Sequence, residues 1–162
     1  MTYYQVIQRA FNAYYRRGEY AYYYGAKGQI LTDSTMRALE EAEPEYFKQY
    51  TPEQLEDIHR FSRGKIGLDC SGFINLVSGV IGYSTLLYEQ STNKTTPHDG
   101  TEGNILYTTF GGTGRHIGLD VGYGYFMDCP KEGETFRFGK IGEYPWEKSG
   151  QINGIDYTGA KN

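Results

Sequence analysis

One cysteine of this 162-residue chain stands where its thiol could act as a nucleophile. Cys70 follows Asp69 and precedes Ser71 and Gly72, and an apolar run of helical spacing begins directly after it. We expect Asp69 to be the N-cap of a helix, which places Cys70 in the first helical turn. Backbone N–H groups and the helix dipole there stabilise a thiolate and an oxyanion, and Gly72 would let a substrate backbone come close. The alternative is core packing, since free cysteines are among the most buried residues.

A cysteine nucleophile needs a base, and the chain contains three histidines. His116 begins a predicted strand, and the apolar residues that alternate behind it face the core. His116 should therefore face the opposite side, toward a cleft or solvent. His59 falls on a predicted helix and His98 in a polar loop, where packing and solvent contact are the simpler interpretations. This makes His116 the candidate base.

A third polar group follows in the predicted hairpin. If residues 122–124, Gly-Tyr-Gly, form a three-residue turn, residue 128 is the diagonal neighbour of residue 116 on the same face. Asp128 could then accept a hydrogen bond from His116, fix its tautomer and stabilise the imidazolium. Cys129 would point into the core, although a slip of one residue in register would present it to His116 instead.

The predicted secondary structure puts the candidate nucleophile, Cys70, on a helix and the candidate base, His116, on a strand. Capping-box patterns mark helix starts at Thr2 and Thr51. We expect a first helix that ends near Gly18 and a second over about 34–43. A third should begin near residue 52, and a fourth should run from its cap at Asp69 to Gly82. Later segments alternate as strands, namely GNILYTTF, RHIGLDVG, YFMDC, TFRFGKIG and GQINGIDY. Helices followed by antiparallel strands predict an α+β domain over residues 1–162.

Composition excludes several classes of protein. A net charge of −4 argues against nucleic acid as a partner, and no apolar run is long enough to predict a membrane span. Neither cysteine lies in a CxxC pattern, and no histidine spacing suits zinc, so we expect no metal or organic cofactor. Residues 33–57 carry eight acidic and two basic side chains. The simplest interpretation of this charged segment is a solvent-exposed surface.

Three segments resemble the NlpC/P60 cysteine peptidases. LDCSGFINLV is similar to the Asp-Cys-Ser-Gly nucleophile motif of that family. GNILYTTFGGTGRHIGLDVGYGYFMDC resembles the block that carries the histidine, followed about a dozen residues later by a polar residue, here Asp128. YYYGAKG resembles the Tyr-x-Tyr/Trp-Gly-Gly segment and puts Tyr22 at the family's substrate-contacting tyrosine. The resemblance covers about residues 3–28 and 64–130.

The resemblance implies a papain-like fold, in which N-terminal helices and the nucleophile helix pack on a central antiparallel sheet. It implies hydrolysis of amide bonds in bacterial peptidoglycan stem peptides, commonly between D-glutamate and a diamino acid. Cys70 would be the nucleophile, His116 the base and Asp128 the orienting group. The substrate, often through a free N-terminal amine, would meet Tyr22, Asp69, Ser71 and Gly72.

The chain also departs from the family pattern. Arg115 stands where glycine is usual, Asn104 replaces the usual aspartate, and Asp128 occupies a position where histidine, asparagine or glutamine is more common. An acidic helical insertion over about 29–63 separates two blocks that usually lie close together. This insertion is a solvated embellishment, a lid over the cleft, or a surface that docks onto another domain of a longer protein.

Other functions fit the same residues. An N-acetylmuramoyl-L-alanine amidase would use the same three catalytic side chains, and an acyltransferase or deamidase would use the same chemistry on another substrate. A non-catalytic wall-binding module would keep only the fold. The N-terminus lacks a signal-peptide pattern. We therefore expect a protein made in the cytoplasm that reaches the cell wall as a phage endolysin, a tail-associated hydrolase or an injected effector.

Overall fold

The computed structural model describes residues 1–111 and 114–161, so residues 112, 113 and 162 of the predicted domain lie outside the described residues. The helices are α1 (Tyr3–Tyr15), α2 (Asp33–Ala42), α3 (Pro44–Phe47), α4 (Pro52–Ser62), α5 (Cys70–Ser78) and α6 (Ser84–Glu89), with 3₁₀ turns η1 (Arg17–Glu19), η2 (Pro97–Asp99) and η3 (Ile141–Glu143). The strands are β1 (Tyr20–Tyr22), β2 (Lys27–Ile30), β3 (Ile66–Leu68), β4 (Thr92–Thr95), β5 (Ile105–Gly111), β6 (Gly114–Gly122), β7 (Tyr125–Asp128), β8 (Arg137–Lys140) and β9 (Lys148–Gln151).

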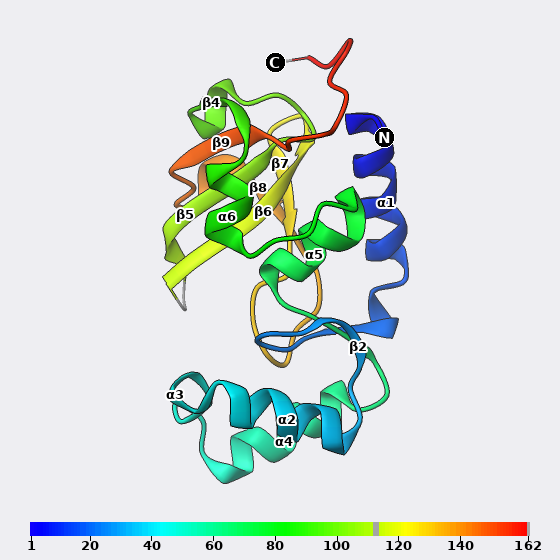
Figure 1. Cartoon of the computed structure of the whole chain (residues 1–162), viewed down its shortest axis with the longest axis vertical. Coiled ribbons are helices and arrows are strands. Elements are labelled where there is room, and N and C mark those ends of the chain that lie inside the picture. The colour runs from blue at the N-terminus through cyan, green and yellow to red at the C-terminus, as the bar shows by residue number, and fades with distance from the viewer. Residues whose placement is uncertain (112–113, 162) are drawn as a thin grey trace.

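A six-stranded antiparallel sheet forms the centre of the fold, in the order β4-β9-β5-β6-β7-β8. Helices α1 and α5 cover one face of this sheet (Figure 1). The core between them joins Val6 of α1, Phe73 of α5 and Leu119 of β6, all fully buried. A smaller apolar cluster that contains Phe126 and Trp146 lies apart from that core. Helices packed on an antiparallel sheet confirm the α+β prediction.

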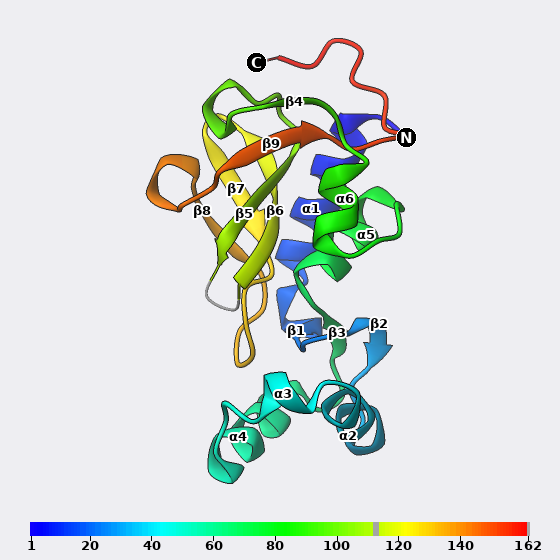
Figure 2. The same ribbon diagram turned by 60° about the vertical axis from the view of Figure 1, so that its left-hand side comes forward.

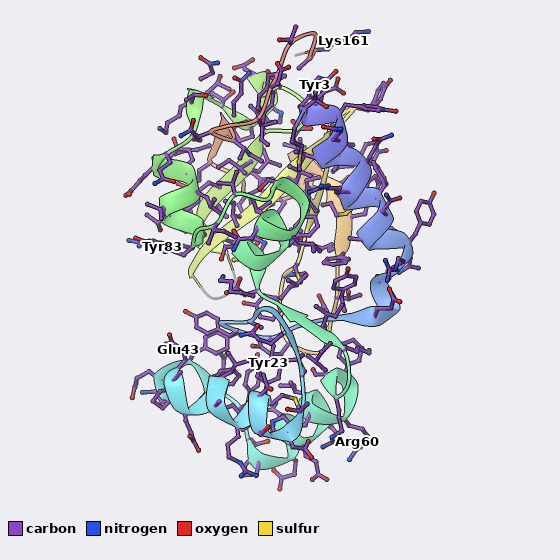
Figure 3. The ribbon with its side chains drawn as sticks, turned by 45° about the vertical axis from the view of Figure 1, so that its right-hand side comes forward. Tyr3, Tyr23, Glu43, Arg60, Tyr83 and Lys161 are labelled. Carbon is purple, nitrogen blue, oxygen red and sulfur yellow. The ribbon has the colours of Figure 1, made fainter. Side chains whose placement is uncertain are left out.

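A second lobe is built from residues that follow β2. Helices α2, α3 and α4 lie together at one end of the molecule in both ribbon views (Figures 1 and 2). They enclose an apolar cluster of their own, centred on Tyr23, Met36 and Phe47. Tyr23 lies where this lobe meets the rest of the chain, as Figure 3 shows. The strands β1, β3 and β2 form a small sheet that connects the lobe to α5.

Buried polar contacts tie this lobe to the loop after β7. Glu132 accepts hydrogen bonds from the hydroxyls of Tyr46 and Tyr50 at 2.6 and 2.9 Å. Its other oxygen accepts from the backbone N–H of Tyr24 at 3.1 Å. Burial raises the pKa of Glu132, and these hydrogen bonds act in the opposite direction. Specific contacts therefore attach these helices to the rest of the chain.

Local sequence signals set most helix starts correctly. Thr2 and Thr51 form the two predicted capping boxes, and Asp69 caps α5 through a hydrogen bond from the Gly72 backbone. The predicted end of α5 is wrong. The helix stops at Ser78 because Gly79 adopts a left-handed conformation (φ 74°), a helix end that glycine makes without strain.

Some elements differ from the sequence-based expectation. Because α5 ends early, Ile81 is 78% exposed although its spacing predicts the buried face. Helix α1 ends at Tyr15, before the expected stop at Gly18. Helix α6 and strand β4 arise from segments that show no clear periodicity. No helix in the described ranges is long and apolar enough to cross a membrane.

Candidate active site

The thiol of Cys70 lies at the first residue of α5, as the capping pattern predicts. The Asp69 carboxylate accepts a hydrogen bond from the Gly72 backbone N–H at 2.7 Å, and the Asp69 backbone N–H donates to the Ala26 carbonyl at 2.9 Å. These bonds fix the helix start from both sides. Cys70 itself is only partly buried, whereas Cys129 is fully buried.

His116 and Asp128 meet across the hairpin of β6 and β7. The strands pair Leu119 with Met127 and Asp120 with Phe126, the register expected from a three-residue turn. The turn itself is tighter, because Tyr123 and Gly124 both have positive φ (55° and 78°) and a bulge precedes them. The same register brings His116 Nε2 to 2.7 Å from Asp128 Oδ2.

The histidine connects the thiol to the carboxylate. Burial lowers the pKa of His116, but hydrogen bonds to Asp128 and Cys70 outweigh burial and raise this pKa to about 9. Because Nε2 is bonded to Asp128, Nδ1 is the ring nitrogen left to exchange a proton with the Cys70 thiol. At neutral pH the imidazole is therefore protonated.

The far side of His116 is covered, which corrects the expectation of a cleft or solvent there. The Trp146 indole stacks on the imidazole, with ring centres 5.5 Å apart, and Tyr144 approaches its edge at 6.1 Å. His116 is only 4% exposed as a result. Gly118 leaves room for this layer, since a Cβ there would lie 2.8 Å from the Trp146 ring. The rings hold the imidazole in one orientation.

Arg137 is a member of the site that the sequence analysis missed. Strand β8 pairs Arg137 directly with Asp128. The guanidinium Nε donates to Asp128 Oδ1 at 3.0 Å, and Nη2 donates to Oδ2, the oxygen that also faces His116. Asp128 is fully buried, so these bonds supply the pairing that a buried charge requires. Alternation in the segment TFRFGKIG placed Arg137 on a strand but gave no sign of its partner.

The predicted substrate-contacting residues surround the thiol. Tyr22 is 2% exposed, and burial, with the nearby Cys70 thiol, raises the pKa of Tyr22 well above its usual value, so the hydroxyl stays neutral. Asp69 and Ser71 are hydrogen-bonded to each other at 3.0 Å. Both also contact the ammonium group of Lys27, which the sequence analysis did not include.

The remaining cysteine and histidines occupy other places. Cys129 is fully buried in the core cluster, where burial raises the pKa of its thiol. The His59 ring contacts Glu40 in the helical lobe and lies near Tyr23. His98 lies in η2. These positions agree with the simpler interpretations of these side chains.

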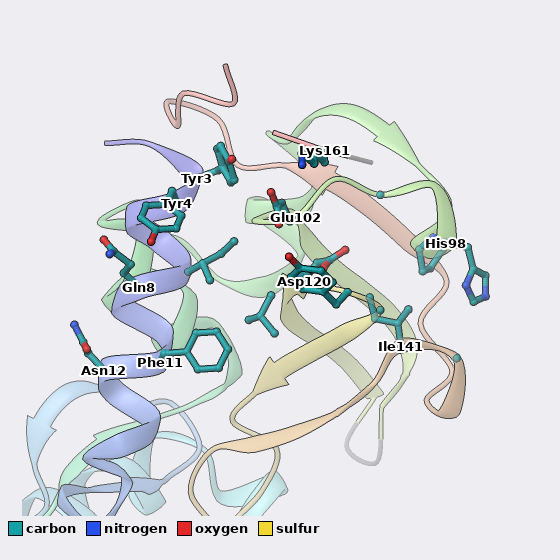
Figure 4. Close-up of a pocket in the computed structure, with 18 residues that line it drawn as sticks. Tyr3, Tyr4, Gln8, Phe11, Asn12, His98, Glu102, Asp120, Ile141 and Lys161 are labelled. Carbon is teal, nitrogen blue, oxygen red and sulfur yellow. The ribbon is translucent and has the colours of Figure 1, made fainter. Parts of the chain in front are cut away.

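A cavity of about 1090 Å³ lies between α1 and the β6–β7 turn (Figure 4). Its lining includes Tyr3, Phe11, Glu102 and Asp120, and it contains none of the three candidate catalytic residues. Burial raises the pKa of Asp120 to about 6. Among the described residues, no group of three or more His, Cys, Asp or Glu side chains could hold a metal ion.

No protein-family model and no curated protein matches this chain. Solved structures do resemble it. The NlpC/p60 domain of the peptidoglycan hydrolase SagA has a TM-score of 0.59 and 18% identity, over 94% of this chain and 100% of that domain. NlpC2 and NlpC1 from Trichomonas vaginalis have TM-scores of 0.55 and 0.53, each with 14% identity, over 91% and 96% of this chain. This chain spans 47% and 45% of those two proteins. The chain therefore has the NlpC/P60 fold that its motifs predict.

Proposed function

We propose that this chain is a cysteine hydrolase that cleaves amide bonds in bacterial peptidoglycan stem peptides at the cell wall. The observation that carries the proposal is the connected set of side chains at the start of α5. His116 Nε2 is hydrogen-bonded to Asp128 at 2.7 Å, and Cys70 is close enough to His116 to raise the pKa of its imidazole. Covalent acyl transfer by a thiol needs a nucleophile, a base and a group that orients the base, and these three side chains can fill those roles.

The reaction follows from the protonation states of these groups. The Cys70 thiolate attacks the carbonyl carbon of the scissile amide and forms a tetrahedral intermediate. The His116 imidazolium gives its Nδ1 proton to the leaving amine, the C–N bond breaks, and a thioester remains on Cys70. His116 then takes a proton from water, whose oxygen attacks the thioester. The C–S bond breaks, the acid product leaves, and the Cys70 thiolate is restored beside the imidazolium. Asp128 stabilises the imidazolium at each protonated stage.

The start of α5 supplies charge stabilisation as well as the nucleophile. The N–H groups of a first helical turn have no carbonyl partner within the helix, so they can donate to the oxyanion of the intermediate. The Asp69 side chain already occupies the N–H of Gly72, which leaves those of Cys70 and Ser71 for the oxyanion. The neutral hydroxyl of Tyr22 is a further donor beside the thiol.

We propose an endopeptidase that acts between D-glutamate and the diamino acid, and digestion of purified peptidoglycan tests this. Wild-type protein and Cys70→Ala are each incubated with walls of several chemotypes, and the products are analysed by mass spectrometry. Cleavage within the stem peptide by the wild type alone is expected. A released stem peptide with an intact lactyl group on the glycan would instead identify an amidase.

Chemical inhibition tests the mechanism separately. Iodoacetamide should abolish the activity because it alkylates the thiolate of Cys70, whereas EDTA should leave it unchanged. Alkylation is assigned by peptide mapping, since buried Cys129 should react much more slowly. Loss of activity with EDTA and resistance to iodoacetamide would rule out the cysteine mechanism.

A further inference from the structure

The oxygen atoms beside the nucleophile already hold a cation. Lys27 begins β2 and pairs with Leu68, the residue before the helix cap. Its ammonium group donates to Asp69 Oδ1 and to the Ser71 hydroxyl, on either side of Cys70 in the chain. Strand pairing fixes the Lys27 backbone, so the contact is built into the small sheet.

The same Asp69 oxygen already accepts from three donors. Oδ1 accepts from Lys27, from the Gly72 backbone at 2.7 Å and from the Ser71 hydroxyl at 3.0 Å. Only 12% of the Asp69 side chain is exposed. A substrate ammonium that approached these oxygens would have to displace Lys27 or lie beside a like charge. Both raise the free energy of binding.

The Lys27 head group favours a different substrate end. An ammonium has three N–H donors, of which Asp69 and Ser71 take two. The Lys27 side chain is 37% exposed, and its two partners flank Cys70 in the chain, so a ligand at Cys70 could accept from the third donor. A carbonyl or carboxylate oxygen would accept it, whereas an ammonium has no lone pair to do so.

We propose that Lys27 determines specificity by filling this site with the chain's own ammonium. The substrate is then a stem peptide whose amino end is acylated, with the acyl carbonyl hydrogen-bonded to Lys27, and not one with a free amine. This inference rests on the proposed function and names the form of substrate that the site takes. It predicts action on stem peptides that are still attached through an amide.

The test compares two synthetic stem peptides that differ only in a free or an N-acetylated amino end. Binding is measured by calorimetry on Cys70→Ala protein, so the comparison does not depend on turnover, and kcat/KM is measured on active protein. Wild type should favour the acetylated peptide by at least about tenfold, the effect of one charge-assisted contact. Lys27→Met should reduce or invert this ratio, and Lys27→Arg should retain it.

Matched controls separate specificity from general damage. Lys140→Met removes an exposed lysine on β8 that is paired with Glu143, and it should leave the ratio unchanged. If Lys27 only supported the fold, Lys27→Met would weaken both peptides equally, and that outcome overturns the inference. Tighter binding of the free-amine peptide to wild type, or binding of neither peptide, overturns it as well. Selective binding without cleavage would refute the proposed hydrolysis and leave the role of Lys27 standing.

Discussion

Replacing the carboxylate of Asp128 by an amide is the sharpest perturbation of the candidate site. Asp128→Asn keeps the side-chain shape but removes the negative charge that His116 and Arg137 share. Asp128 Oδ2 accepts from both partners, and Oδ1 accepts from Arg137 Nε at 3.0 Å. An asparagine has only one oxygen, so in either orientation its NH₂ group faces a donor.

The size of the effect follows from the charge. A carboxylate in hydrogen-bonding contact raises a histidine pKa by about 1–3 units, which is about 1.4–4 kcal/mol. In the wild type Asp128 and Cys70 together outweigh burial and give His116 a pKa of about 9. Without the Asp128 charge, burial is opposed less strongly and the imidazolium is lost at lower pH. We expect kcat/KM at neutral pH to fall by about 10- to 1,000-fold, with the alkaline limb of its pH profile moved toward acid.

The raised pKa of His116 should also make the free energy of unfolding depend on pH, in a direction that can be worked out. The folded pKa of His116 lies near 9, above the ordinary value of 6.5, so protonation of His116 stabilises the fold below pH 6.5. This contribution, at most about 3 kcal/mol, is lost as the pH rises from 6.5 toward 9. Urea unfolding across that range should show the decline in wild type and a smaller one in Asp128→Asn.

The matched control is Asp57→Asn, the same substitution on an exposed helix position. It should change neither the pH profile of kcat/KM nor the pH dependence of unfolding. If Asp128→Asn leaves the alkaline limb where it is in wild type, the carboxylate does not set the pKa of His116. The reasoning from the hydrogen-bonded chain is then refuted.

Two further substitutions test how the site is supported. Gly118→Ala should cost about 1–3 kcal/mol of stability and lower kcat, because the new Cβ would meet the Trp146 ring. Gly18→Ala is the control, because a Cβ there meets open space and should change neither quantity. Unfolding and steady-state kinetics measure both variants, and an unchanged kcat in Gly118→Ala would show that Trp146 does not hold the histidine. Tyr46→Phe should cost about 2 kcal/mol at neutral pH by removing a hydrogen bond to buried Glu132. That bond also lowers the pKa of Glu132, so its loss raises this pKa. The loss of stability should therefore be smaller in acid, where Glu132 is protonated in both proteins, and denaturation at two pH values measures this. A loss of stability that is independent of pH would exclude the charge of Glu132 as its cause.

Short-range interactions account for what the sequence predicted well. The cap at Asp69, its bond to Gly72 and the start of α5 depend on residues within one helical turn. The hairpin that aligns His116 with Asp128 depends on a turn and a strict alternation. These signals lie within a few residues of each other, so they can be recognised before the fold is known.

Contacts made by distant segments were not predictable in the same way. Lys27 meets Asp69 across 42 positions of sequence, because β2 happens to pair with β3. Trp146 reaches His116 only after the chain returns through β8 and η3. The early stop of α5 at Gly79 shows a different limit, since Gly79 and Gly82 are both glycines after the apolar run and the sequence alone does not say which one ends the helix.

The two unpredicted cations have a common electrostatic consequence. The acids next to the nucleophile and the base would each oppose a thiolate if they were unpaired. Asp69 is paired with Lys27, and Asp128 with Arg137 as well as His116. Because each carboxylate has a cation of its own, the charges around Cys70 and His116 nearly balance. A thiolate beside a buried imidazolium would need such a balance, since its stability depends on hydrogen bonds and on the absence of uncompensated charge. The capping pattern and the hairpin register identified the acids from sequence, but the cations explain why this site tolerates them.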